Sequence, residues 1–187
     1  MAQHKYSVPG MDPANAEQVA QTLQQRLVAL TDLHLTLKHI HWNVVGPNFI
    51  AVHEMLDPQV EAVRKMSDAI AERIATLGFE PIGTPGAIAS SRAWEDYSIN
   101  RATTQEHLAA LDIVYRGVVA DHRAAIEEFD KLDLVTQDLL IEQSHKLELF
   151  QWFVRAHLED PSGRLAHSGA VGEREAADAA ARQQPPY

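Results

Sequence analysis

Apolar residues recur with the period of an α-helix along most of this chain. The first such pattern begins near Asn15, and its apolar positions follow one another at intervals of four and three residues. Two histidines interrupt this apolar seam, which consists of Leu23, Leu27, Leu30, His34, Leu37 and His41. Further helical patterns cover about residues 49–77, 101–131 and 134–159. The pattern predicts four long helices and no strand of any length.

The connections between these helices carry strong turn signals. The sequence VVGPN ends the first helix, and the segment 78–86, GFEPIGTPG, cannot continue the second. Pro58 either starts a new helix capped by Asp57 or kinks a continuous one, and we expect the kinked continuous helix. The link between helices two and three is long, with room for a short helix around Ile88. A crossover of this kind joins parallel helices in some bundles, so we predict an all-α four-helix bundle with a long crossover.

The two ends of the chain differ in composition from its middle. Residues 1–13 hold two prolines and a glycine, and we expect them to form an N-terminal arm. Residues 14–160 carry the helical patterns and form the predicted bundle. After Asp160 the composition shifts to Ala, Gly, Gln and Pro, which predicts a flexible C-terminal tail over residues 161–187.

Composition and charge narrow the possible functions. The chain has 187 residues, no cysteine and a formal net charge of −10. Disulfides, thiolate metal sites and cysteine nucleophiles are therefore excluded. The negative charge disfavours a general affinity for phosphate backbones and favours the attraction of cations. We see neither a secretory signal nor an apolar run of the ~20 residues that span a bilayer, and we expect a cytoplasmic protein without a membrane partner.

A stripe of ligand-type side chains marks the second predicted helix. At about 100° per residue, His53, Asp57, Asp68 and Glu72 fall at roughly 0°, 40°, 60° and 100° around the helix axis. Imidazole and carboxylate groups bind iron, manganese or zinc. The His53/Asp57 and Asp68/Glu72 pairs are nevertheless about 22 Å apart along the helix, too far for one metal centre. A two-fold axis could place this helix antiparallel to its copy in a second chain. His53/Asp57 of one chain would then face Asp68/Glu72 of the other, giving two equivalent sites.

The same stripe has a simpler interpretation. Polar residues one turn apart on a long helix usually form a solvated face. The stripe borders an apolar face, however, and a carboxylate beside apolar surface is costly unless it is paired or binds a metal. This apolar face comprises Phe49, Leu56, Val60 and Val63. The spacing alone leaves both interpretations open.

Three motifs resemble the Dps family, the mini-ferritins, over roughly residues 20–160. They are KHIHWN at residues 38–43, GPNFIAVHEMLD at residues 46–57 and DAIAER at residues 68–73. The sequence FQWF at residues 150–153 adds to the likeness. The resemblance implies a ferritin-like four-helix bundle, assembled through two-fold dimers into a hollow homo-dodecamer.

The resemblance also implies an activity and a set of ligands. The family is a ferroxidase: it oxidises Fe(II), preferably with hydrogen peroxide, stores the ferric mineral in its shell and so protects the cell and its DNA from oxidative damage. Its non-haem iron site lies between subunits. The matching residues here are His41, His53 and Asp57 from one chain, with Asp68 and Glu72 from its mate. Two ferrous ions held together can each give one electron to a peroxide, which consumes it without releasing hydroxyl radical.

Other residues near these motifs have more than one interpretation. Trp42 is a candidate electron donor that quenches stray oxidising equivalents, or its ring packs the end of the first helix. His34 lies on the apolar seam, and we expect a hydrogen-bonded interior side chain rather than a ligand. His39 lies off the seam and is expected to be structural or exposed.

The fourth predicted helix carries a Glu-x-x-His element, Glu142 with His145, of the kind found in classical di-iron bundles. Such bundles need a second copy of this element, which the second helix lacks, so we do not expect a di-iron centre within one chain. Asp138 and Glu142 could instead line an acidic pore where iron enters, although such pairs are usually solvated.

Two functions from other classes remain as alternatives. Many members of this family compact DNA through basic terminal extensions, which would place the protein in the nucleoid. The tail from residue 161 is charge-neutral, 3 − 3, and gives little counterion release. Its charged residues are Arg164, Arg174, Arg182, Glu173, Glu175 and Asp178. A dodecamer would multiply weak contacts, so DNA binding stays open. The other alternative is a purely structural shell with vestigial ligands.

Overall fold

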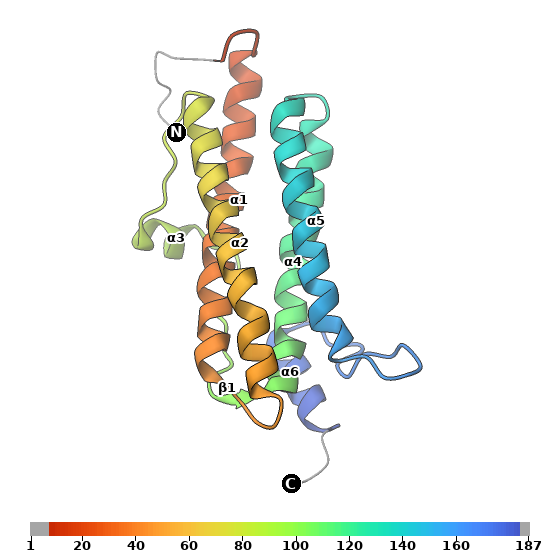
Figure 1. The fold of residues 1–187 in the computed structure, drawn as a ribbon. Coiled ribbons are helices and arrows are strands. Elements are labelled where there is room, and N and C mark those ends of the chain that lie inside the picture. Colours follow the sequence, from red (N-terminus) through yellow and green to blue (C-terminus); the bar gives the residue numbers. More distant parts are fainter. Residues whose placement is uncertain (1–7, 184–187) are drawn as a thin grey trace. The chain divides into compact units, whose positions relative to one another are not determined.

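The computed structural model describes residues 8–183, and its regular secondary structure is almost entirely helical (Figure 1). The long helices are α1 (Pro13–Asn43), α2 (Phe49–Thr76), α4 (Thr104–Phe129) and α5 (Leu134–Ala156), and the short ones are α3 (Pro85–Ser91) and α6 (Glu173–Ala181). The predicted all-α class, the four long helices and the short helix around Ile88 are confirmed.

Helix α2 runs through Pro58 without interruption, as the sequence predicts. Proline removes one backbone donor, and the carbonyl of Glu54, one turn earlier, loses its helical partner. Both residues are exposed, so water can bind that carbonyl. The cost of a proline inside the helix is therefore limited at this position.

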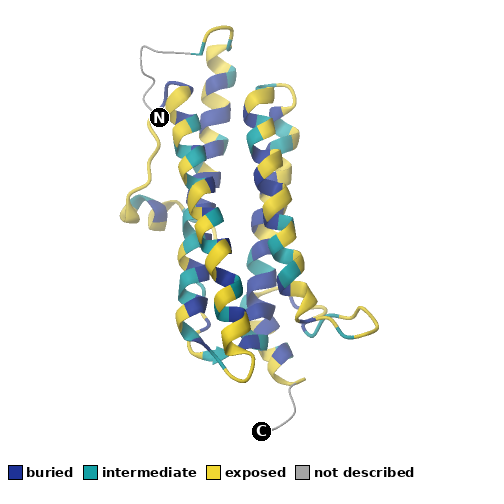
Figure 2. Ribbon diagram, viewed as in Figure 1, coloured by how far each residue is buried: buried dark blue, intermediate teal, exposed yellow. Residues whose placement is uncertain are grey.

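The chain divides into two compact units, and each long helix contributes a segment to both. Within the described residues, the first comprises 8–34, 61–95 and 120–145, and the second 35–60, 96–119 and 146–183. Each helix buries one face and exposes the other (Figure 2). The core of the first unit includes Leu23, Leu30, Ile70, Ile74, Phe129 and Leu140, and that of the second Leu37, Ile40, Val52, Leu56, Leu108, Tyr115 and Leu147.

In the first unit, polar contacts hold the start of the crossover against α1. Gln24 exchanges two hydrogen bonds with the backbone of Ile82, at 2.8 and 2.9 Å. Asp32 accepts hydrogen bonds from Arg92 Nη1 at 3.0 Å and from Trp94 Nε1 at 2.8 Å. Side chains of α1 therefore fix the crossover on both sides of α3.

The second unit contains a short parallel strand pair, and the prediction of no strand of any length is wrong. Strand β1 (Val44–Val45) pairs with β2 (Ala102–Thr103) in the register Val44 with Ala102 and Val45 with Thr103. Two residues are too few to show an alternating pattern. The pairing ties the end of the crossover to the turn between α1 and α2.

The described part of the C-terminal segment, residues 161–183, is folded, which corrects the expectation of a flexible tail. Ala176, Ala177 and Ala180 form the buried face of α6, and Ala177 joins Ile99 and Ala110 in a core cluster of the second unit. An alanine-rich segment stays flexible when its small apolar face has no surface to pack against. Here that face packs against the second unit, so the segment is folded. Whether the domain boundaries fall at residues 13 and 160 stays a prediction.

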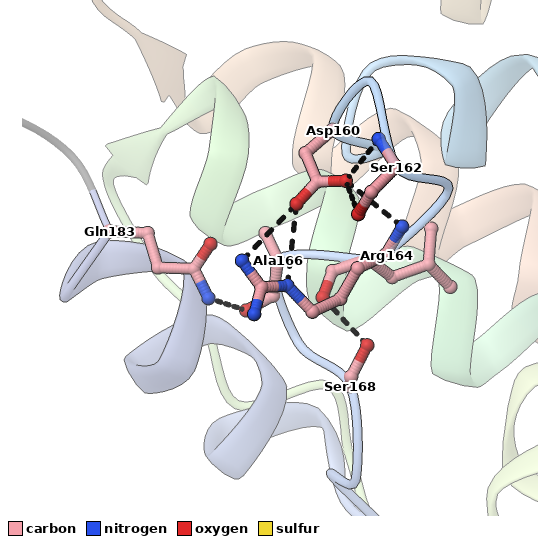
Figure 3. Close-up of polar contacts among 7 residues, drawn as sticks. Asp160, Ser162, Arg164, Ala166, Ser168 and Gln183 are labelled. Atoms are coloured by element: carbon pink, nitrogen blue, oxygen red, sulfur yellow. Dashed lines mark hydrogen bonds and ion pairs between the residues drawn. The ribbon is translucent and has the colours of Figure 1, made fainter.

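A compact loop leads from α5 towards α6 (Figure 3). Asp160 accepts hydrogen bonds from the backbone N–H groups of Ser162 at 2.8 Å and Arg164 at 3.1 Å. Hydrogen bonds from the Ser162 side chain and the Arg164 backbone lower the pKa of Asp160 to about 2. Gln183 then closes the segment by donating to the carbonyl of Ala166 at 2.7 Å.

Candidate metal centre

Two predicted ligands meet where α1 turns into α2. Gly46, with a φ of 110°, helps to reverse the chain between the two helices. The rings of His41 and His53 stack with their centroids 3.6 Å apart and their planes at 25°. His41 Nδ1 lies 3.1 Å from the carbonyl of His53, and His53 Nδ1 lies 3.0 Å from the carbonyl of His41.

These reciprocal contacts fix which nitrogen can bind a metal. A carbonyl oxygen only accepts hydrogen bonds, so Nδ1 of each ring must donate. In a neutral imidazole the other nitrogen, Nε2, then carries the lone pair. Burial lowers the pKa of His41, and Lys38 lowers it further, against the opposing effects of the His53 carbonyl and Asp57. His41 is therefore neutral at pH 7, which is the form that coordinates metals.

Asp57 lies beside this pair. Its Oδ1 is 3.4 Å from His41 Nδ1 and 3.6 Å from Lys38 Nζ, and its side chain is 56 % exposed. Asp57 therefore adjoins His41 on its Nδ1 side, in the same unit as the His41–His53 pair. The contact of Lys38 with Asp57 was not predicted. The one sequence feature that could have suggested this contact is the position of Lys38 in the KHIHWN motif.

The side chain of Trp42 is 71 % exposed, with Lys38 Nζ 5.6 Å from its ring centroid. Within a single chain its ring contacts Lys38 of the same helix and is otherwise largely exposed, so both interpretations of Trp42 stay predictions. Other large apolar side chains on α1 and α2 of this unit are also exposed, among them Leu35, Phe49 and Ile50. The ring of Phe49 lies 4.9 Å from that of His53, so exposed apolar surface adjoins the histidine pair.

Asp68 and Glu72 also lie on α2, but in the first compact unit. Both are exposed. Among residues 8–183, no three His, Asp or Glu side chains of one chain form a group that could hold a metal ion. The five predicted ligands therefore divide into His41, His53 and Asp57 in one unit and Asp68 and Glu72 in the other.

The remaining candidate residues fall mostly where the sequence suggests. His39 is half-buried and donates a hydrogen bond from Nε2 to the carbonyl of Ile99 at 2.8 Å, which is a structural role. His34 is half-buried in the first unit. Glu142 and His145 are both exposed, so they do not face a bundle interior as a di-iron element would.

Comparison with known proteins agrees with this fold. Residues 20–162 match the family model of the ferritin-like domain. The chain is 60% identical, over 95% of its length and 97% of the relative's, to the DNA protection during starvation protein of Mycolicibacterium smegmatis. It therefore belongs to the Dps family of ferritin-like proteins.

Solved structures of this family show the same fold. The tetragonal form of Mycobacterium smegmatis Dps has a TM-score of 0.87 at 60% identity, covering 89% of this chain and 100% of that one. Dps from Microbacterium arborescens in the high iron form has a TM-score of 0.75 at 31% identity, covering 85% of this chain and 100% of that one. Among residues 8–183, no helix is long and apolar enough to cross a membrane.

Proposed function

We propose that this protein is a cytoplasmic ferroxidase that oxidises Fe(II), preferably with hydrogen peroxide, at sites shared by two chains. It stores the ferric product inside a hollow dodecamer and so protects the cell and its DNA. The observation that carries the proposal is the histidine pair, His41 and His53, with Nδ1 of each ring held by a backbone carbonyl and Asp57 beside it. Such an arrangement leaves both Nε2 atoms for a metal.

The second half of the site comes from another copy. Asp68 and Glu72 supply the further carboxylates that a site of two imidazoles and one carboxylate lacks. A two-fold axis makes each chain give its histidine half to one site and its acidic half to the other. The exposed apolar side chains near the histidines, Trp42 and Phe49 among them, are the surface that such a partner would cover.

The chemistry follows from a pair of ferrous substrate ions. Each Fe(II) gives up one electron, and one hydrogen peroxide takes both electrons and two protons to form two water molecules. Neutral imidazoles hold Fe(II) without adding charge, and carboxylates stabilise the Fe(III) product. Iron in this role is supported by the family and by its relative in the high iron form. In the same scheme Trp42 donates an electron when an oxidising equivalent escapes.

The activity can be tested by adding Fe(II) and hydrogen peroxide anaerobically and following ferric absorbance. We expect His53→Ala and Glu72→Ala each to slow oxidation by at least about tenfold, since each removes a ligand. The matched control is Glu54→Ala, which removes an exposed carboxylate next to His53. We expect it to keep the wild-type rate. If Glu72→Ala oxidised iron as fast as wild type, the proposed site would be wrong.

Mixed oligomers test the sharing between chains. When His53→Ala and Glu72→Ala chains are unfolded together and reassembled, each mixed dimer has one site with neither ligand and one intact site. With random pairing, half of the dimers are mixed, so about one quarter of the sites should recover. The expected result is that the mixture oxidises iron clearly faster than either parent variant. A mixture as inactive as its parents would show that both halves come from the same chain.

Direct DNA binding is the second candidate, because the M. smegmatis relative is named for DNA protection during starvation. Two arginines of the C-terminal segment are engaged within this chain. Arg164 pairs with Asp160 at 3.2 Å, and Arg174 donates to the carbonyl of Ser98. We therefore propose that protection of DNA comes mainly from removal of iron and peroxide, with nucleoid binding through the termini as a weaker activity.

A further inference from the structure

A tyrosine and a histidine form a second polar pair in the unit that contains the histidine half of the site. The hydroxyl of Tyr97 lies 3.0 Å from Nδ1 of His107, and the two rings are nearly parallel, at 14°, with centroids 6.1 Å apart. Tyr97 is half-buried in the crossover, whereas His107 on α4 is completely buried. This geometry suits transfer of one proton from the phenol to the imidazole.

Both groups are neutral before any such transfer. Burial lowers the pKa of His107 to about 4, against the opposing effect of the Asn43 backbone, so the imidazole is neutral and can accept a proton. Burial also raises the pKa of Tyr97 well above its usual value, and the nearby Glu173 raises it further, whereas Arg174 lowers it. Tyr97 therefore does not lose a proton by itself. It can lose one only together with an electron.

Contacts connect this pair to the end of α1 that carries the candidate iron ligands. The ring of His39 meets Tyr97 edge-on, with centroids 5.8 Å apart and planes at 70°. A hydrogen bond with the backbone of Asn43, the residue after Trp42, raises the pKa of His107. The Tyr97–His107 pair thus adjoins the last turns of α1, in which His41 and Trp42 lie.

We propose that Tyr97 and His107 form a redox pair that intercepts strong one-electron oxidants escaping from the iron site. This inference rests on the proposed ferroxidase function as the source of the oxidant. The oxidant is a hydroxyl radical, formed when one Fe(II) reduces hydrogen peroxide by a single electron. Tyr97 gives it one electron and becomes a neutral tyrosyl radical, while its phenolic proton moves to Nδ1 of His107 and the hydroxyl radical becomes hydroxide. A later electron from another Fe(II) restores Tyr97, and the proton returns.

Tyr115 provides an internal comparison. It is completely buried, and its hydroxyl donates to Oε1 of Gln59 at 2.7 Å. An amide oxygen is not a base at neutral pH. Gln59 therefore accepts the hydrogen bond but cannot take the phenolic proton of Tyr115. Of the two tyrosines in the described residues, Tyr97 is therefore the one whose hydrogen-bond partner can take the phenolic proton when the ring is oxidised.

The first experiment needs no iron. Iron-free protein is oxidised by photogenerated tris(bipyridine)ruthenium(III) and frozen, and the tyrosyl radical is measured by electron paramagnetic resonance, with ring-deuterated tyrosine to identify it. We expect Tyr97→Phe to lose most of the tyrosyl signal and Tyr115→Phe to keep it. Circular dichroism checks that each variant is folded. An undiminished signal in Tyr97→Phe, or an equal loss in Tyr115→Phe, would overturn the proposal.

The role of His107 has its own test. His107→Gln keeps a hydrogen-bond acceptor but removes the base, so tyrosyl radical formation should slow by about a hundredfold. Formation at the wild-type rate in a folded His107→Gln variant would exclude His107 as the proton acceptor. If that variant does not fold, the comparison of Tyr97→Phe with Tyr115→Phe decides the proposal.

A second experiment replaces the photo-oxidant with Fe(II) and hydrogen peroxide. We expect a tyrosyl signal in wild type that Tyr97→Phe lacks, together with fast ferric absorbance in wild type. Slow iron oxidation would count against the proposed function alone, because the photo-oxidation result does not depend on iron. Fast iron oxidation with the same tyrosyl signal in wild type and Tyr97→Phe would overturn the redox pair and leave the ferroxidase function standing.

Discussion

The contact between His167 and Asp112 allows a quantitative prediction about the C-terminal segment. His167 Nε2 donates to Asp112 Oδ2 at 2.9 Å, and both side chains are almost completely buried. The other oxygen of Asp112 accepts from Gln151 at 2.8 Å and lies 3.5 Å from Arg155 Nε. Burial opposes the charge of Asp112, but the hydrogen bonds from His167 and Gln151 and the charge of Arg155 outweigh it, so its pKa is lowered.

His167→Ala should destabilise the protein by about 3 kcal/mol. Removing one partner from a buried pair costs about 3–5 kcal/mol, and the lower end applies because Gln151 and Arg155 still contact Asp112. In a domain of this size, each kcal/mol lowers Tm by about 2–4 °C, so we expect a fall of about 6–12 °C. The segment 161–183 should also become more sensitive to protease, because His167 is a buried anchor between it and α4.

The assay is thermal unfolding at fixed protein concentration, since Tm depends on concentration in an oligomer. His157→Ala is the matched control, because His157 is exposed and its side chain contacts the carbonyl of Phe153, one turn earlier in the chain. A folded-state pKa below the usual 3.8 means that Asp112 contributes stability above that pH and loses it as the pH falls through the lowered pKa. The difference in Tm between wild type and His167→Ala should thus be largest near pH 7 and become smaller in acid. A fall no larger than that of His157→Ala would refute this reasoning.

Three further predictions concern other parts of the chain. Arg73→Ala removes hydrogen bonds to Thr136 at 2.8 Å and Asp133 at 2.6 Å, so we expect a loss of about 2 kcal/mol in denaturant unfolding. Burial raises the pKa of Asp133, but the hydrogen bonds from Thr136 and Arg73 outweigh burial and lower it. The loss of stability in Arg73→Ala should therefore shrink as the pH falls through that lowered pKa. Ala177→Glu puts a charge into the core cluster and should release α6 to protease, whereas the exposed Ala181→Glu should not. In gel-shift titrations, binding to DNA should vanish near physiological salt, and retardation that persists there would show that the termini bind DNA strongly.

Helix periodicity predicted the long helices because each buries one continuous apolar face. The seam residues Leu23, Leu30 and Leu37 are all completely buried. The continuity of α2 through Pro58 was also predicted, and the exposure of that turn makes it possible. The β1–β2 pair and α6 were not predicted. A two-residue strand has no period, and α6 owes its burial to a partner surface that includes Ile99 and Ala110, far away in the sequence.

The candidate site was predictable as a list of residues but not as geometry. Sequence alone named His41, His53 and Asp57, but it did not show that each histidine binds the other's backbone carbonyl. That exchange depends on how closely α1 and α2 approach at their shared turn. The contact of Lys38 with Asp57 depends on the same approach. Motifs identify ligand types, whereas the packing of the two helices selects the nitrogen that each histidine presents.

The KHIHWN motif shows how helix geometry divides two neighbouring histidines between different tasks. Residues two apart on an α-helix point about 200° apart, so His39 and His41 cannot serve one metal ion together. The structure follows this rule: His41 stacks on His53, whereas His39 contacts Tyr97 and the carbonyl of Ile99. One turn of α1 therefore carries the candidate iron ligand on one face and the contact to the proposed redox pair on the other. A substitution at His39 should consequently act through Tyr97 and not through loss of a metal ligand.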